Sequence, residues 1–417
     1  MSPDPRSSES AEPSEQTIVI VGAGQAGGWA AQTLRKEGFA GRVVMVGDEC
    51  HPPHERPPLS KAVLAGEATA ESTWLQKPEA FDALAVDWRA GSRVARIDRA
   101  SKSLVMADGE SIHYDKLILC TGGRARPLAI PGADALAVHT LRTIDNALAL
   151  APVLGPGHTV VVIGGGWIGL EVAATARKKG AEVIVIEAQN RLCERTVPCE
   201  ISEHLLALHR SHGTRVLLGA GVAGLQTSLG GRSIVTLANG EALTCDAIVA
   251  GIGMLPNDEL ARDAGLECEG GVIVDSRCRT SDPDILAAGD VAVTPNPWAG
   301  RRLRLESWQN AQEQGIAAAR SALGLEVDYQ PLPWFWSDQY EVNLQIFGMP
   351  APAHRVVLRG DRSAGSFVMF FLDGDKVVAA LGPNSARDLR FARRLIERRT
   401  SVDAGRLADL QVPLSKL

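Results

Sequence analysis

Two stretches of the chain share one pattern, in which an apolar, β-branched run breaks into a glycine turn and a helix-compatible segment follows. The runs are IVIVGAGQAG at residues 18–27 and VVVIGGGWIG at residues 160–169. Each run predicts a buried strand, a Gly-x-Gly-x-x-Gly turn and a helix, with a second apolar strand after the helix. The duplication therefore predicts two dinucleotide-binding units, with the glycines Gly22, Gly24, Gly27, Gly164, Gly166 and Gly169.

Further apolar and polar runs extend each unit. In the first unit we expect a helix over 24–37, a hairpin between 98–106 and 111–113, and strands over 17–21, 42–46 and 116–120. In the second unit we expect helices over 144–153, 168–179 and 201–211, and strands over 159–163, 182–186 and 247–250. A strand over 284–290 and a helix over 309–323 then return to the first unit.

The composition changes at PLPWFWSDQY, residues 331–340. Beyond it we expect a basic helix over 385–399, preceded by strands over 343–347, 356–358, 367–372 and 377–381. The predicted fold is α/β, with two Rossmann-like nucleotide-binding domains of glutathione-reductase type and a C-terminal α+β domain. The expected bounds are a disordered leader over 1–15, a discontinuous first domain over 16–123 and 255–330, a second over 124–254 and a third over 331–417.

Bulk composition narrows the function. A net charge of −6 over 417 residues gives no reason to expect nucleic-acid binding. The 7 cysteines include no Cys-x-x-Cys pair, and no histidine cluster has metal-ligand spacing, so we expect no metal site. The polar N-terminus lacks a signal peptide, and no apolar run is long enough to span a membrane. These features favour a cytoplasmic enzyme with reduced thiols.

One acidic residue follows each glycine turn at the end of the next strand. Asp48 suits a ribose hydroxyl in the first unit, and Glu187 does so in the second. A carboxylate at Glu187 accepts from a ribose 2′-hydroxyl and repels a 2′-phosphate, which favours NADH over NADPH. The nearby Arg191 and Arg195 leave phosphate binding open as the weaker alternative.

The chain also resembles a known family. The resemblance rests on GAGQAG, GDE…ERPPLSK, LILCTGG, LRT, GGGWIGLE, GIGMLPN, DILAAGD, RLES and PWFWSDQY, in this order along nearly the whole length. These motifs are similar to those of the FAD-dependent NADH:ferredoxin reductases of bacterial oxygenase systems. The resemblance implies FAD in the first unit, at Gly22, Gly24, Ala26, Gly27, Asp48, Lys61, Val94, Arg142, Asp290 and Trp308. It implies NADH in the second unit, at Gly164, Gly166, Ile168, Gly169, Glu171, Glu187, Arg195 and Gly253.

Three residues are candidates for a part in catalysis. The resemblance implies that Lys61 and Glu171 pair across the domain junction beside the flavin, where a buried cation would favour the reduced ring. An ordinary interdomain salt bridge is the alternative. The resemblance also places Trp336 beside the flavin, whereas Trp334 fits either the flavin site or core packing.

The implied partner is a [2Fe–2S] ferredoxin that serves an oxygenase. Ferredoxins are usually acidic, so we expect a local basic surface. Two candidates are a cluster of Arg301, Arg302 and Arg304, and the basic face of the terminal helix, which includes Arg390 and Arg394. A merely solvated charged face is the other interpretation of that helix.

Three other functions stay open at this stage. A reductase of a thiol or another small molecule would need a redox cysteine, for which Cys50 is the candidate, but Glu55 occupies the place of a second cysteine. A flavoprotein of the apoptosis-inducing-factor type would mainly bind a partner. A rubredoxin acceptor is a close variant of the favoured function.

Overall fold

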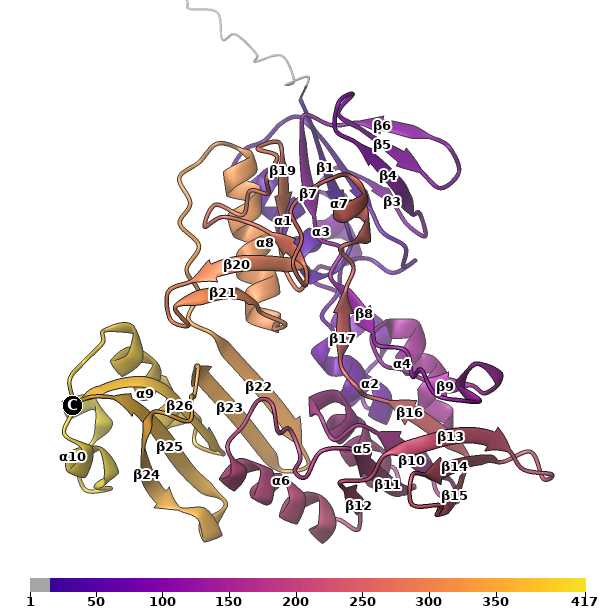
Figure 1. Ribbon diagram of the computed structural model, residues 1–417. Helices are drawn as coiled ribbons and strands as arrows, with labels where there is room; N and C mark the ends of the chain where they lie inside the picture. Colours follow the sequence, from indigo (N-terminus) through magenta and orange to yellow (C-terminus); the bar gives the residue numbers. More distant parts are fainter. Residues whose placement is uncertain (1–15) are drawn as a thin grey trace, which may run out of the picture.

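The computed structural model describes residues 16–417, so the leader expected over 1–15 lies outside the described residues. Figure 1 shows three parts: two α/β units, one above the other, and an α+β part beside the lower unit. The predicted fold class is therefore confirmed. No helix within the described range combines the length and hydropathy needed to cross a bilayer.

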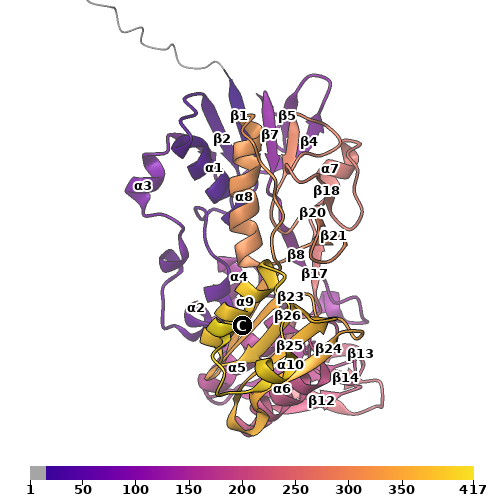
Figure 2. The ribbon, with the colours of Figure 1, turned by 90° about the vertical axis from the view of Figure 1, so that its left-hand side faces the viewer.

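The first nucleotide unit is built on a parallel sheet of order β19-β7-β1-β2-β3. Its strands are β1 (Thr17–Val21), β2 (Arg42–Val46), β3 (Val86–Arg89), β7 (Lys116–Leu119) and β19 (Ile285–Ala287). All of β1 is buried, because a central parallel strand is covered on both faces. Helices α1 (Gln25–Lys36) and α8 (Trp308–Ala322) lie side by side over one face (Figures 1 and 2).

The opposite face is covered by a small antiparallel sheet and by α7 (Glu259–Asp263). The small sheet contains β4 (Val94–Asp98), β5 (Ser103–Met106) and β6 (Ser111–His113). The expected single strand over 98–106 is wrong, because residues 99–102 form a turn in which Lys102 has φ +47°. A second small sheet holds β18 (Val272–Ile273), β20 (Ala292–Asn296) and β21 (Arg301–Arg304).

The second nucleotide unit repeats the design with sheet order β12-β11-β10-β16-β9. Its strands are β9 (Val138–His139), β10 (Thr159–Ile163), β11 (Glu182–Glu187), β12 (Arg215–Leu218) and β16 (Ala247–Ala250). Helices α4 (Ile144–Leu150), α5 (Trp167–Lys178) and α6 (Cys199–Ser211) belong to this unit. A separate antiparallel sheet of β13 (Val222–Thr227), β14 (Ser233–Leu237) and β15 (Ala242–Cys245) packs on the face of the parallel sheet opposite α5.

The two segments that join these units pair with each other. Strands β8 (Gly123–Ala125) and β17 (Met254–Pro256) run antiparallel, with Gly123 opposite Pro256. This two-stranded connection lies where we expected the chain to leave and re-enter the first unit. The bounds of 16–123 with 255–330, 124–254 and 331–417 stay a prediction.

The C-terminal part is an antiparallel sheet of order β22-β23-β26-β25-β24. Its strands are β22 (Trp334–Gln339), β23 (Val342–Gly348), β24 (Arg355–Asp361), β25 (Ser366–Asp373) and β26 (Lys376–Pro383). One face packs on α9 (Ala386–Glu397) and the short α10 (Ala404–Ala408), and the other packs against the second nucleotide unit. The sequence pattern did not predict β22, whose residues line the site described next.

Candidate active site

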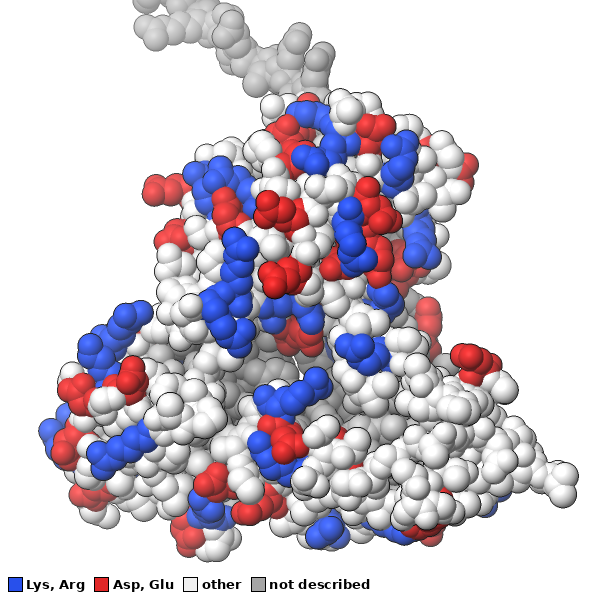
Figure 3. Space-filling view, viewed as in Figure 1, with Lys and Arg blue, Asp and Glu red and all other residues white. Residues whose placement is uncertain are grey.

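A cavity of about 1130 Å³ lies where the three parts of the molecule meet. Both glycine turns, the proline-rich loop after β2 and strand β22 contribute to its wall. Figure 3 shows a recess between the upper and lower parts of the molecule on this side. One continuous space therefore joins the two predicted nucleotide sites.

The first glycine turn has the geometry of a phosphate site. A Cβ atom added to Gly22, whose φ is +110°, would lie 2.1 Å from the carbonyl oxygen of Cys120, and one on Gly27 would lie 2.0 Å from that of Gly22. A Cβ on Gly24 would meet only the guanidinium of Arg56, at 3.6 Å. The outer glycines are thus required by packing, whereas Gly24 leaves its backbone open to the cavity at the start of α1.

The second glycine turn repeats this division of roles. A Cβ on Gly164 would lie 2.5 Å from the carbonyl oxygen of Gly251, and one on Gly169 would lie 2.1 Å from that of Gly164. Gly166 has nothing nearer than 3.8 Å. Both turns therefore leave room for a dinucleotide phosphate beside the backbone.

Glu187 is held in the wall of the second site by two backbone donors. Its Oε2 accepts from the N–H of Gly165 at 2.6 Å, and its Oε1 accepts from the N–H of Gln189 at 2.7 Å. Arg191 donates instead to the carbonyls of Val197 and Glu194 and does not line the cavity. Arg195, Ile168 and Gly253 do line it.

The predicted flavin residues are mostly brought together. Ala26, Asp48, Lys61, Arg142, Asp290 and Trp308 line the cavity. Arg142 Nη2 donates to Asp290 Oδ2 at 2.7 Å, which ties the second unit to the end of β19. Val94, the first residue of β4, is not in the lining and packs in the core between the small antiparallel sheet and the parallel sheet. Its predicted contact with FAD stays untested.

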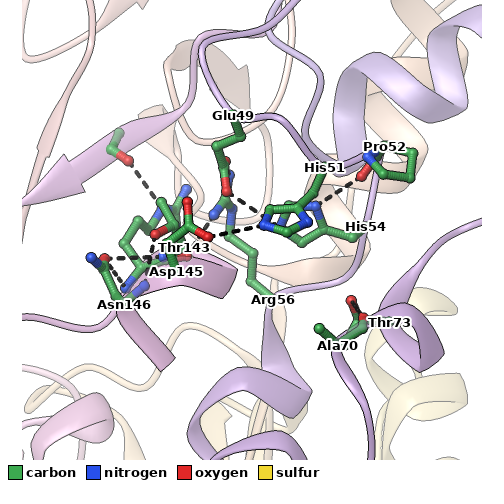
Figure 4. A network of polar contacts seen from close by, with 12 residues as sticks. Glu49, His51, Pro52, His54, Arg56, Ala70, Thr73, Thr143, Asp145 and Asn146 are labelled. Carbon is green, nitrogen blue, oxygen red and sulfur yellow. Dashed lines mark hydrogen bonds and ion pairs between the residues drawn. The ribbon is translucent and has the colours of Figure 1, made fainter. Parts of the chain in front are cut away.

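Arg56 is a cavity residue that the sequence pattern did not single out. Figure 4 shows Arg56 beside Glu49, to which its Nη2 donates at 2.7 Å. Its Nη1 donates to the carbonyl of Arg142 at 2.5 Å. Burial, and then the neighbouring Arg142, lower the pKa of Arg56. A basic residue in a proline-rich loop beside a glycine turn is the signal that would have identified it.

A histidine cluster extends from the same loop to α4 of the second unit. His51 Nε2 lies 3.0 Å from Asp145 Oδ1, and the fully buried His54 lies behind it against Glu49 (Figure 4). Burial and the charge of Arg56 lower the pKa of His54. The cluster fixes the proline-rich loop, and with it the direction of Arg56.

Lys61 and Glu171 form the expected ion pair. Lys61 Nζ lies 2.7 Å from Glu171 Oε2, and the two side chains are 22% and 5% exposed. Ser60 donates to the same carboxylate oxygen, and Ser337 Oγ donates to the other oxygen at 2.7 Å. Both serines were missed, although both lie inside motifs that carry the family resemblance.

Strand β22 brings aromatic side chains to the cavity wall. Trp336 and Phe335 line the cavity, and the Trp336 ring packs edge-to-face on Trp308 with centroids 5.9 Å apart. Trp334 stacks on Trp336 and on Phe347 of the C-terminal core, and is not in the lining. For Trp334, therefore, packing is the interpretation that the structure favours.

Comparisons with known proteins place this geometry in a family. Residues 16–315 match the family described as pyridine nucleotide-disulphide oxidoreductase, and residues 334–417 match that described as reductase C-terminal. The chain belongs to the pyridine nucleotide-disulphide oxidoreductase family.

Three relatives are similar to this chain along nearly their whole length. Rhodocoxin reductase of Rhodococcus erythropolis is 40% identical over 95% of this chain and 93% of that protein. The ferredoxin–NAD(+) reductase component of the anthranilate 1,2-dioxygenase system of Burkholderia cepacia is 40% identical over 96% and 99%. The crystal structure of the covalent putidaredoxin reductase–putidaredoxin complex matches with a TM-score of 0.92, at 38% identity over 96% and 97% of the two chains. The resemblance seen in the sequence is confirmed.

The thiols of this enzyme do not form a redox pair. All seven cysteines, which lie within residues 16–417, are free, and Cys50 is exposed outside the cavity lining. Cys120 and Cys193 do line the cavity, but burial raises the pKa of Cys120 to about 12 and raises that of Cys193 still further. Within the same range, no group of histidine, cysteine and acidic side chains could hold a metal ion.

The basic residues predicted for docking differ in their surroundings. Arg390 and Arg394 are exposed on α9, and Arg301 and Arg302 are exposed on β21. Arg304 is instead 20% exposed and contacts Glu306 at 2.6 Å. The segment after α9 contacts the β20–β21 connection, because the guanidinium of Arg399 lies 5.5 Å from the centroid of the Trp298 ring.

Proposed function

We propose that the chain is an NADH-dependent flavoprotein that reduces a [2Fe–2S] ferredoxin serving an oxygenase. The observation that carries this proposal is the common cavity, which joins both glycine turns and contains the Lys61–Glu171 pair in its wall. The names of the relatives support the choice of acceptor, since they include a ferredoxin–NAD(+) reductase component of a dioxygenase system.

The first unit would hold FAD. Gly22, Gly24 and Gly27 form the phosphate turn, and the open space at Gly24 would let the phosphates approach the backbone N–H groups at the start of α1. The Asp290 carboxylate, braced by Arg142, would hold the ribityl chain. When bound there, FAD would supply both two-electron hydride chemistry with NADH and one-electron chemistry, which suits a one-electron acceptor. Ala26, Asp48, Lys61 and Trp308 would complete the site.

The second unit would hold NADH. Glu187 is fixed by two backbone donors and would accept from the ribose 2′-hydroxyl while repelling a 2′-phosphate. Arg191 is already engaged with backbone carbonyls, so Arg195 remains the basic side chain in this part of the wall. These contacts support a preference for NADH, with Gly164, Gly166, Ile168, Gly169, Glu171 and Gly253 forming the rest of the site.

Lys61, Glu171 and Trp336 are proposed to support the hydride step. Lys61 brings a positive charge to the cavity wall, where it would stabilise an electron-rich ring. Glu171 accepts from Lys61 and both serines, so its charge offsets part of the cost of burying the ammonium group. Trp336 lines the same cavity and packs on Trp308, and its apolar surface would help to exclude water from the reacting groups.

The ferredoxin would dock beside the cavity opening. Figure 3 shows blue side chains close to the recess, over the region of β20 and β21. Two exposed pairs of arginines would attract an acidic protein, namely Arg301 and Arg302 on β21, and Arg390 and Arg394 on α9. Arg304 is the weaker candidate for docking, because its Nη1 already donates to the backbone carbonyl of Asp290 at 3.1 Å.

One assay tests this function. The purified protein, NADH and cytochrome c are mixed with and without a [2Fe–2S] ferredoxin from an oxygenase system. We expect rapid cytochrome reduction only with the ferredoxin present. Equal rates with and without it, for every ferredoxin tried, would contradict the proposed acceptor.

We also propose a cytoplasmic location. The seven free thiols support it, because such thiols are typical of a reducing compartment. Cell fractionation with detection of the protein tests this proposal, and recovery in a secreted or membrane fraction would contradict it.

A further inference from the structure

A line of buried hydrogen bonds runs from Glu171 into the C-terminal domain. Ser337 Oγ donates to Glu171 Oε1 at 2.7 Å, and Gln339 Nε2 donates to Ser337 Oγ at 3.1 Å. His209 Nε2 lies 2.9 Å from Gln339 Oε1. The four side chains belong to residues that are between 0% and 4% exposed and come from α5, β22 and α6.

The direction of each hydrogen bond in this line is fixed by chemistry. An ionised carboxylate only accepts, so the Ser337 hydroxyl must donate to Glu171 and accept from the amide of Gln339. The amide oxygen of Gln339 then accepts from His209, which must carry its proton on Nε2. Among residues 16–417, His209 Nδ1 has no hydrogen-bond partner and is buried, in agreement with a neutral ring of this tautomer. Burial lowers the pKa of His209 to about 4.

This line cannot carry a proton from one end to the other, because a side-chain amide does not release one near neutral pH. Its effect is electrostatic, since every donor points toward Glu171 and each bond polarises the next. Oε1 is held by Ser337, and Oε2 is held by Ser60 and Lys61. The carboxylate is therefore fixed at both oxygens, and it in turn fixes the ammonium group of Lys61.

Strand β22 contributes to the wall as well as to this support. Phe335 and Trp336 line the cavity, and the next residue, Ser337, contacts Glu171. We propose that Ser337 and Gln339, anchored by His209, are positioning residues that hold Glu171, and through it Lys61, for the hydride step. This inference rests on the proposed function and gives the C-terminal domain a part in the first half-reaction.

The first test compares Ser337→Ala with the matched control Ser363→Ala, because Ser363 is an exposed residue whose hydroxyl donates to Asp361. We expect Ser337→Ala to slow reduction of the bound flavin by saturating NADH about tenfold, which equals about 1.4 kcal/mol. The half-saturating NADH concentration stays within about twofold, because the Glu187 contacts are untouched. The flavin midpoint potential becomes more negative, whereas Ser363→Ala changes none of these values.

A pair of substitutions at Gln339 tests the direction of the hydrogen bonds. Gln339→Met removes the amide, whereas Gln339→Glu keeps its shape and its acceptor for His209 but loses the donor toward Ser337. A carboxylate there would draw the Ser337 hydroxyl away from Glu171. We therefore expect slower flavin reduction in Gln339→Glu than in Gln339→Met, at equal flavin content. The reverse order would contradict the proposed direction.

A spectroscopic measurement on the unmodified enzyme keeps the inference testable if a variant fails to fold. Nitrogen NMR of 15N-histidine-labelled protein should show one ring that is protonated at Nε2 and unprotonated at Nδ1. The 15N chemical shifts of this ring should stay constant between about pH 6 and 8 and should change in Gln339→Met. A His209 ring of the other tautomer would overturn the proposal. A flavin-loaded Ser337→Ala enzyme with unchanged rate and potential would also overturn it. If NADH fails to reduce the unmodified enzyme, the proposed function fails instead.

Discussion

Replacing Lys61 by methionine separates a catalytic role from a structural one. The substitution keeps most of the aliphatic length and removes the ammonium group that lies 2.7 Å from Glu171 Oε2. Breaking a fully buried ion pair by removing one partner costs about 3–5 kcal/mol of folding stability. Here Lys61 is 22% exposed and two serine hydroxyls remain on the carboxylate, so we expect a smaller loss, about 1–3 kcal/mol.

The expected effect on catalysis is larger than the effect on folding. Removing one preorganised group that stabilises developing charge typically slows a reaction about 10²–10³-fold. We therefore expect Lys61→Met to retain FAD and to unfold at a modestly lower denaturant concentration. Reduction of its flavin by NADH should slow by about two to three orders of magnitude.

The assay is anaerobic stopped-flow mixing with NADH, followed by the loss of flavin absorbance in a single turnover. The matched control is Lys36→Met, because Lys36 is an exposed residue in the last turn of α1, away from the cavity. A Lys61→Met enzyme with full flavin content and a rate within about twofold of the unmodified enzyme would refute the catalytic role. The pair would then be an interdomain salt bridge only.

Three further predictions follow from the cavity wall and the surface. Glu187→Ala should raise the KM for NADH about tenfold and reduce the enzyme's preference for NADH over NADPH, measured as the ratio of the two kcat/KM values. An unchanged ratio would show that this carboxylate does not determine the choice of nucleotide. Gly24→Ala should fold but bind FAD more weakly, whereas Gly27→Ala should fail to fold stably, because the added Cβ would lie 2.0 Å from a backbone oxygen. Measurements of flavin content and of thermal unfolding distinguish the two variants. Identical behaviour of the two would contradict the roles assigned to these glycines. Replacing both Arg390 and Arg394 by Glu should lower the rate of ferredoxin reduction and the salt dependence of that rate, while the rate of ferricyanide reduction stays unchanged. An equal loss of rate with both acceptors would refute docking at α9.

The elements with a strong local pattern could be predicted from the sequence. The β1–α1 and β10–α5 units were predicted to within about a residue or two, because a buried parallel strand followed by a glycine turn has a pattern that few other structures share. The turn over 99–102 was missed because a lysine, not a glycine, takes the left-handed conformation there. Strand β22 was missed because aromatic residues occupy both of its faces, so the usual alternation is absent.

The site could be predicted only where a motif carries it. Lys61 and Glu171 were identified through the family resemblance, although they lie 110 residues apart. Ser337 and His209 were not, because their partners lie 166 and 130 residues away and no local pattern links them. Short polar side chains gain their meaning from burial and from the fold that brings them together, and neither is visible in a single sequence.

The central claim is that flavin and nicotinamide nucleotide share one cavity and deliver electrons to an iron–sulfur protein. Anaerobic titration of the purified, flavin-loaded protein with NADH, followed by oxidised [2Fe–2S] ferredoxin, tests it most directly. We expect about one equivalent of NADH to bleach the flavin and about two equivalents of ferredoxin to restore its colour. A flavin that stays oxidised under excess NADH, or that stays reduced when the ferredoxin is added, would contradict it.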